Sequence, residues 1–206
     1  MKKVGVLGGT FNPIHNGHIL LANKALKEFD LDFILFVPTG LPPHKSTKDL
    51  ASKKDRLKMA AIAIKDNKRF KLSGIEISRG GYSYAIDTFS RLKKKLGQKT
   101  KLYYVMGLDS INSILSWKRP LELFKMCEFI VATRPGSKIR TFKRLIKFPP
   151  LAINKDKISV IEVKKAVSST EIRSRIRSGI SVSKLVQPEV EKYLLENSIY
   201  QKGKRS

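Results

Sequence analysis

The stretch KVGVLGGTFNPIHNGHILLANKALKEF, residues 3–29, decides the fold of this chain. Residues 3–7 are almost all apolar and predict a buried strand. A glycine-rich loop follows, and apolar residues then recur at helical spacing over residues 17–29, which predicts a helix. A buried strand that passes through a short loop into a helix is the unit from which parallel sheets are built.

The same alternation continues along the chain. Further strands are predicted at residues 33–37, 70–77, 102–106, 128–132 and 158–163, and further helices at about 52–64, 84–96, 169–178 and 188–196. Residues 135–155 show no clear period. The pattern predicts an α/β fold with a doubly wound, mainly parallel sheet and a short helical C-terminal part. We expect a single domain over residues 1–206, a basic tail at about 201–206, and ligands beyond the carboxyl ends of the strands.

Composition limits the cellular setting. The chain has 206 residues, of which 41% are hydrophobic, and no apolar run approaches the roughly 18 residues that a membrane span needs. The sequence opens directly on a strand pattern and has no signal-peptide layout. The single cysteine, Cys127, cannot form an internal disulfide and lies in an apolar setting typical of a buried residue. We therefore expect a cytoplasmic protein without membrane attachment.

The net charge is the unusual feature of the composition. There are 42 basic and 17 acidic residues, which gives a formal net charge of +25. Such a charge raises the prospect of nucleic-acid binding. The charge is dispersed, however, and the longest basic run is only Lys93–Lys95. We favour a solvated, lysine-rich surface with a bias toward anionic ligands, so that nucleic acid is an unlikely partner, and the sequence leaves the oligomeric state open.

The loop after the first strand, GGTFNPIHNGH at residues 8–18, carries the first candidate site. It contains neither a GxGxxG fingerprint nor a P-loop. Its glycines allow close approach of the backbone to a ligand, and Thr10 offers a hydroxyl group. His15 and His18 lie beside the N–H groups of a helix start, which makes a good anion site. A zinc site would need a third ligand such as His44, and we expect no protein-bound metal.

The segment SSTEIR at residues 168–173 carries the second candidate site. Ser168 is a suitable N-cap, and Glu171 stands at the capping-box position. Ser169, Thr170 and the N–H groups of the first helical turn then form a second anion site, with Arg173 one turn further along. The alternative is an ordinary capped, basic surface helix, but the presence of the first motif favours a phosphate site.

The motifs also carry a family resemblance. The loop GTFNPIHNGH resembles the G-x-F-x-P-x-H-x-G-H signature of the nucleotidyltransferase superfamily, and the chain as a whole resembles the bacterial nicotinate-nucleotide adenylyltransferases. Asn12 stands where many members have aspartate. The resemblance rests on an ordered set of further matches: PTGLPPHK at 38–45, SYAIDT at 83–88, MGLDS at 106–110, ATRPG at 132–136, and SSTEIR at 168–173.

The resemblance implies a Rossmann-like nucleotidyltransferase fold that transfers AMP from ATP to nicotinate mononucleotide in NAD synthesis. It implies catalytic roles for His18 and His15, and Mg²⁺ that arrives with ATP. The residues that it assigns to ATP are Gly8, Gly9, Thr10, Phe11, His15, His18, Gly107, Asp109, Arg134, Ser169, Thr170 and Arg173. Those that it assigns to the mononucleotide are Asn12, Lys45, Tyr84, Asp87, Thr88 and Trp117.

Some of these residues have simpler interpretations from the sequence. Asp109 could serve as the N-cap of a helix that starts at Ser110, Asp87 as a first-turn helix charge, Lys45 as a solvated cation, and Trp117 as a core residue. Alternatives to the whole assignment also stay open. They are a sister adenylyltransferase acting on nicotinamide mononucleotide or phosphopantetheine, a basic nucleic-acid-binding protein that uses the domain as a scaffold, and a noncatalytic nucleotide sensor.

Overall fold

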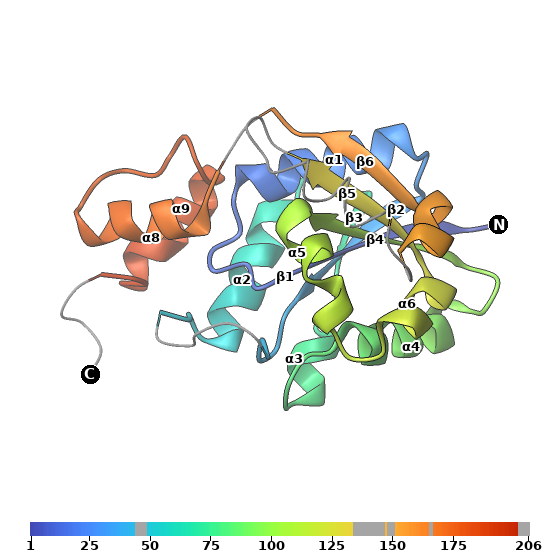
Figure 1. Cartoon of the computed structure of the whole chain (residues 1–206). Coiled ribbons are helices and arrows are strands. Elements are labelled where there is room, and N and C mark those ends of the chain that lie inside the picture. Colours follow the sequence, from blue (N-terminus) through green and yellow to red (C-terminus); the bar gives the residue numbers. More distant parts are fainter. Residues whose placement is uncertain (44–48, 134–146, 148–150, 165–166, 202–206) are drawn as a thin grey trace.

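A single six-stranded sheet, parallel throughout, forms the centre of the protein (Figure 1). The computed structural model describes residues 1–43, 49–133, 147, 151–164 and 167–201. The strand order is β3-β2-β1-β4-β5-β6. The strands are β1 (Lys3–Gly9), β2 (Phe33–Pro38), β3 (Phe70–Leu72), β4 (Lys101–Gly107), β5 (Glu128–Thr133) and β6 (Ile158–Glu162).

Helices cover both faces of this sheet, so the predicted doubly wound α/β fold is confirmed. The α-helices are α1 (Asn16–Glu28), α2 (Lys53–Ile64), α3 (Ile75–Arg79), α4 (Ala85–Leu96), α5 (Leu108–Asn112), α6 (Pro120–Met126), α8 (Ser169–Arg177) and α9 (Pro188–Glu196). Two short 3₁₀ helices, η1 (Ile114–Ser116) and η2 (Ala152–Lys157), precede α6 and β6.

Alternation along the strands divides the core into two layers. In β2, Ile34 and Phe36 face one layer, while Leu35 and Val37 face the other. The first layer is closed by α1, α2, α8 and α9, and the second by α4, α5 and α6. Figure 1 shows α8 and α9 packed together at one end of the molecule, away from α4 and α6. Both faces of the sheet are therefore buried, as the continuous apolar strands of a parallel sheet require.

Two of the predicted elements need correction. The strand predicted over residues 70–77 ends at Leu72, and α3 begins at Ile75. Its ladder with β2 pairs Phe36 with Leu72 and stops before Pro38, which has no N–H to donate. Ser168 occupies the N-cap position of α8, but its side chain makes no capping hydrogen bond. Glu171, predicted to complete that capping box, instead pairs with Arg175 at 2.8 Å.

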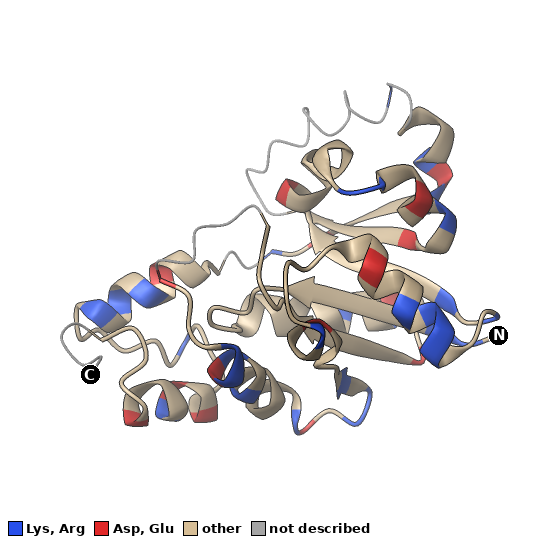
Figure 2. Cartoon of the chain, turned by 90° about the horizontal axis from the view of Figure 1, so that it is seen from below, with Lys and Arg blue, Asp and Glu red and all other residues tan. Residues whose placement is uncertain are grey.

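Basic residues are spread over several elements of the protein. Figure 2 shows lysines and arginines on several helices and loops, with acidic residues among them.

Cys127 is buried, as predicted, and this burial raises the pKa of its thiol. No helix in the described segments is both long enough and apolar enough to cross a membrane.

Within the described residues, a charged side chain lies wholly inside the protein. Arg56, on α2, is 0% exposed and belongs to the largest fully buried side chains of the described residues. Its guanidinium donates to the carbonyl oxygens of Ala51 at 3.1 Å, Thr10 at 2.9 Å, Thr39 at 2.5 Å and Gly40 at 2.9 Å. Burial lowers the pKa of this group. Arg56 thus joins the loops that follow β1 and β2 to the start of α2.

Replacement of Arg56 by methionine tests how much the fold depends on this junction. The change leaves buried carbonyl groups without donors, and we expect the free energy of unfolding to fall by about 3 kcal/mol or more. Urea unfolding followed by circular dichroism measures it. Lys58→Met, at an exposed site on the same helix, is the matched control and should change stability by only about 0.5 kcal/mol. Equal stabilities of the two variants would contradict the assigned role.

Candidate active site

The candidate site lies where the strand order of the sheet reverses. From β1 the chain passes through α1 to β2 on one side, while β4 lies against the other side of β1. In open parallel sheets ligands bind at such a point, beyond the carboxyl ends of the strands. Gly107 ends β4 there, and a Cβ atom added to it would meet no other atom within 4 Å. The space beside the ends of β1 and β4 is therefore open to a ligand.

The two histidines of the first motif lie face to face. The rings of His15 and His18 are stacked, with centroids 3.7 Å apart and planes inclined by 20°. The backbone N–H of His15 donates to Nδ1 of His18 at 3.2 Å. A ring nitrogen that accepts a backbone N–H cannot also donate, so Nε2 is the nitrogen through which the His18 ring can donate. The fold thereby prepares His18 to donate a hydrogen bond from Nε2.

Glycines in the first motif make room for this arrangement. Phe11 is buried with a positive φ of 48° and packs edge-on against His18 at a centroid distance of 5.0 Å. A Cβ atom on Gly9 would lie 3.0 Å from the ring of Phe11. A Cβ atom on Gly17 would lie 3.1 Å from the ring of His15. Larger residues at either glycine would displace the rings that shape the loop.

The second motif lies against the first. Ser169 Oγ donates to the carbonyl oxygen of Pro13 at 3.1 Å. Arg173 Nη1 donates to the carbonyl oxygen of Asn12 at 2.9 Å, and its Nη2 reaches Thr170 Oγ1 at 3.4 Å. These bonds bring the first turn of α8 to the loop that leads into α1. Two helix N-termini and a guanidinium thus meet at one loop, an arrangement that favours a polyanionic ligand.

Residues predicted for the mononucleotide gather around Lys118. Its ammonium group lies 4.7 Å from the ring centroid of Tyr84 and 3.5 Å from the carboxylate of Asp87. The neighbouring Trp117 is half-buried, and its Nε1–H donates to Ser113 Oγ at 3.3 Å. The indole of Trp117 is therefore held at the surface of the core rather than inside it.

Tyr104, on β4, connects the two groups of predicted residues. Its ring centroid lies 6.0 Å from that of Trp117. A Cβ atom on Gly8 would lie 3.2 Å from its hydroxyl oxygen. Burial raises the pKa of the Tyr104 phenol, which therefore stays protonated. The loop after β1 and the Trp117 region are accordingly neighbours along one edge of the sheet.

Two of the predicted site residues are hydrogen-bonded inside the protein, and a third does not fill the capping position that the sequence allowed. Thr88 is buried, donates its hydroxyl proton to Glu76 at 2.8 Å, and uses its backbone N–H within α4. Asn12 is also buried, and its side-chain amide is bonded within the protein. Asp109 is no N-cap, because α5 starts at Leu108, and it lies exposed in the first helical turn. Its carboxylate remains available to a ligand.

Other predicted residues fall outside what the structure describes. These are Lys45 and Arg134, together with His44, the potential zinc ligand, and most of the basic tail. Within the described part of the chain, no group of three or more histidine, cysteine, aspartate or glutamate side chains could hold a metal ion.

Several residues that shape the site were not predicted from the sequence, namely Arg56, Glu76, Lys118 and Tyr200. A signal existed for Arg56, because it shares one face of α2 with the buried residues Met59, Ala60 and Ile64. A basic residue on an apolar helix face indicates a buried cation with partners. No comparable pattern marks Tyr200, whose partner lies 188 residues away in the sequence.

Known proteins resemble this chain in sequence and in fold. The cytidylyltransferase-like family matches residues 6–175. A probable nicotinate-nucleotide adenylyltransferase of Thermoanaerobacter sp. (strain X514) is 42% identical over 99% of this chain and 97% of its own. The corresponding protein of Moorella thermoacetica is 38% identical over 96% of this chain and 91% of its own. The Plasmodium falciparum nicotinic acid mononucleotide adenylyltransferase complexed with NaAD superposes with a TM-score of 0.78 at 23% identity, covering 97% of this chain and 98% of that one.

Glu76 supplies a pH-dependent test of the loop region. This carboxyl group is 8% exposed, and burial raises its pKa, although hydrogen bonds from Thr88 and Ser83 act against the rise. A carboxyl pKa that is higher in the folded than in the unfolded chain contributes to the free energy of unfolding. This contribution is fully present at pH values below the ordinary glutamate pKa. That contribution is lost as pH rises toward the folded-state value, because only the unfolded chain then ionises freely.

The variant Glu76→Gln removes this titration. As pH rises above about 4.3, we expect the free energy of unfolding of the variant to increase relative to that of the wild type. The increase should be about 1.4 kcal/mol for each unit by which folding raises the pKa of Glu76. Urea unfolding between pH 4 and 8 measures the difference. Glu171→Gln, at an exposed glutamate, is the control and should follow the wild-type profile. Parallel profiles for Glu76→Gln and the wild type would show that burial does not perturb this carboxyl group.

Proposed function

Since the chain belongs to the nicotinate-nucleotide adenylyltransferase family, we propose that its site joins ATP and nicotinate mononucleotide to give nicotinate adenine dinucleotide and pyrophosphate. The observation that carries the proposal is the meeting of the two phosphate-binding motifs. Arg173 of α8 binds the carbonyl of Asn12, and Ser169 binds that of Pro13. This geometry accommodates a chain of phosphate groups between two helix N-termini at the switch point of the sheet.

The chemistry is a transfer of an adenylyl group. A phosphate oxygen of nicotinate mononucleotide attacks the α-phosphorus of ATP, a new P–O bond forms, and the bond to the bridging oxygen of pyrophosphate breaks. The attacking oxygen is already anionic at neutral pH, so the protein needs no general base. Catalysis then consists of positioning the reactants and stabilising charge in the transition state. A site of helix N-termini, histidines and an arginine supplies these effects.

His18 is the residue that we assign to the α-phosphate. Its Nδ1 accepts the backbone N–H of His15, so Nε2 is the ring nitrogen that we assign to a non-bridging oxygen. His15, stacked on the same ring at 3.7 Å, holds that ring in place. Thr10 and the glycines contribute to the triphosphate side, while Ser169, Thr170 and Arg173 bind the pyrophosphate that leaves. Asp109, exposed in the first turn of α5, accepts the ribose hydroxyl groups.

We propose that ATP enters as its Mg²⁺ complex. Mg²⁺ prefers oxygen ligands and retains several water molecules, so the phosphate oxygens of ATP can hold it. The ion supplies additional positive charge at the phosphates. The protein's own part is to present helix N-termini, His18 and Arg173 to the remaining oxygens.

We propose that the acceptor binds beside Tyr84, Asp87 and Trp117. The half-buried indole of Trp117 offers a face for the pyridine ring. Because Thr88 uses its N–H inside α4, donors for the ring carboxylate come from the preceding N–H groups of the first turn of α4. Lys118, close to Tyr84 and Asp87, adds a positive charge.

We further propose that small nucleotides, and not nucleic acid, are the ligands of this basic protein, and that it works in the cytoplasm. The dispersed charge of +25 supports the first point, since Figure 2 shows basic residues spread over several elements. A single cysteine, buried in the core, supports a reducing compartment.

Substitution of His18 tests the proposed transition-state contact. We expect His18→Ala to lower kcat by about 10²–10⁴-fold, because the lost hydrogen bond acts mainly in the transition state. The KM for ATP should change much less. Steady-state assays of pyrophosphate release measure both constants. Lys27→Ala, exposed in the last turn of the same helix, is the control. A His18 variant with near-normal turnover would remove this residue from the mechanism.

The choice of acceptor tests the proposed function itself. Donors aimed at a carboxylate disfavour the amide of nicotinamide mononucleotide, whose NH₂ group would face another donor. We expect kcat/KM to favour nicotinate over nicotinamide mononucleotide by at least ~10²-fold, about 2.7 kcal/mol. Dinucleotide formation from ATP and each acceptor, followed by chromatography, measures the ratio. Equal use of both acceptors would overturn the nicotinate assignment and leave adenylyl transfer standing.

Trp117→Ala is the companion variant for the acceptor side. Loss of the stacking face should cost about 1–3 kcal/mol in acceptor kcat/KM and leave the KM for ATP nearly unchanged. Leu115→Ala, at an exposed residue two positions earlier, is the control. A larger change in the KM for ATP than in the kcat/KM for the acceptor would show that the indole serves the ATP side of the site.

A further inference from the structure

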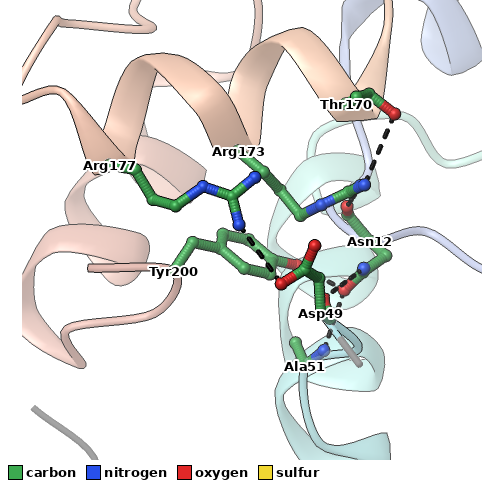
Figure 3. A network of polar contacts seen from close by, with 7 residues as sticks. All are labelled: Asn12, Asp49, Ala51, Thr170, Arg173, Arg177 and Tyr200. Carbon is green, nitrogen blue, oxygen red and sulfur yellow. Dashed lines mark hydrogen bonds and ion pairs between the residues drawn. The ribbon is translucent and has the colours of Figure 1, made fainter. Parts of the chain in front are cut away.

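Tyr200 reaches the first motif from the segment after α9. Its ring is buried, with 7% exposure, and its hydroxyl donates to Oδ1 of Asn12 at 2.6 Å. Figure 3 shows the tyrosine and Asn12 side by side beneath the arginines of α8. The backbone of Tyr200 has a φ of 69°, a strained conformation for a residue other than glycine. Such strain persists only where the surrounding contacts hold the residue firmly.

Both the oxygen and the nitrogen of the Asn12 side-chain amide are hydrogen-bonded. Its Oδ1 also accepts the backbone N–H of Ala51 at 2.9 Å, and its Nδ2 donates to the carbonyl of Asp49 at 2.8 Å. An N–H donor on one side and a carbonyl acceptor on the other allow only one orientation of the amide. Tyr200 supplies the second donor to Oδ1, so its hydroxyl helps to fix both the side chain and the loop that carries it.

The backbone of Asn12 continues the connection to the phosphate site. Its carbonyl oxygen accepts the bond from Arg173 Nη1, and Arg173 in turn reaches Thr170. A second link closes the network, because Arg177 lies 3.2 Å from the carboxylate of Asp49. Figure 3 shows both arginines extending from α8, Arg173 toward Asn12 and Arg177 toward Asp49. Displacement of Asn12 would therefore move the anchor of Arg173.

We propose that Tyr200 is a positioning residue for the ATP phosphates. Through its hydroxyl it sets Asn12, and through the carbonyl of Asn12 it sets the guanidinium of Arg173. The inference rests on the proposed function, which assigns Arg173 to the pyrophosphate end of ATP. It predicts that the hydroxyl of Tyr200 matters for ATP and not for the acceptor, whose proposed residues lie around Lys118.

The chain contains a matched control for this hydroxyl. Tyr193, on α9, donates its hydroxyl proton to Asp55 Oδ1 at 2.9 Å. It belongs to the same C-terminal part and also attaches this part to a polar side chain. Asp55 lies in the first turn of α2, and its side chain is bonded to Ser52 and Tyr193 rather than to Asn12. Tyr193→Phe thus removes a comparable bond without touching Asn12.

The experiment compares Tyr200→Phe, Tyr193→Phe and the wild type. Kinetics are measured with each substrate varied in turn, and the affinity for MgATP is measured by calorimetry without acceptor. We expect Tyr200→Phe to raise both the KM and the Kd for ATP about 10-fold, the effect of one lost hydrogen bond near a charged group. The KM for nicotinate mononucleotide should stay unchanged, and Tyr193→Phe should match the wild type in all three constants.

Hydrogen exchange gives a readout that needs no activity. The amide of Ala51 donates to the same oxygen as Tyr200, so its exchange should quicken in Tyr200→Phe and stay slow in Tyr193→Phe. The positioning role is overturned if Tyr200→Phe leaves ATP affinity unchanged, or raises the KM for both substrates equally. If the wild type makes no dinucleotide, the proposed function fails, and MgATP affinity together with Ala51 exchange still decides the role of Tyr200.

Discussion

The candidate site depends on one buried guanidinium. The loops after β1 and β2 leave the sheet with carbonyl groups that no neighbouring strand can satisfy, and Arg56 binds them from the first turn of α2. Five N–H donors in a rigid plane suit this task better than any other side chain. The removal of a charge from water is costly, and the hydrogen bonds offset that cost. The cation also adds a fixed positive field beneath the loops to which we assign phosphate binding.

Much of the fold could be predicted from the sequence because its signal is local. Four of the six strands, β1, β2, β4 and β5, contain continuous apolar runs, and a parallel sheet buried on both faces requires such runs. The strand predicted over residues 70–77 was too long because its alternation extends past the point where β2 offers partners. Periodicity describes which face a residue turns to the core, but it does not report whether a neighbouring backbone is present.

The candidate site was predictable to a different degree on its two sides. The phosphate side rests on two short motifs, and the structure brings Ser169 and Arg173 to the loop of residues 12–13. On the acceptor side, the sequence could not reveal that Thr88 turns inward to Glu76 or that Lys118 lies between Tyr84 and Asp87. The positions of these side chains depend on how α3, α4 and the segment before α6 pack together. Side-chain type alone does not determine that packing.

The long separation between Asn12 and Tyr200 has a consequence for synthesis of the protein. A ribosome that adds about 5–20 residues per second needs roughly 10–40 s to cover the 188 residues between them. During that interval the early strands can collapse, but the phosphate loop has neither Arg173 nor Tyr200 to hold it. A ligand that binds only the folded form stabilises a chain appreciably only when its concentration exceeds the dissociation constant of the site. Cellular ATP therefore gives the nascent chain little protection until the C-terminal helices have emerged and docked.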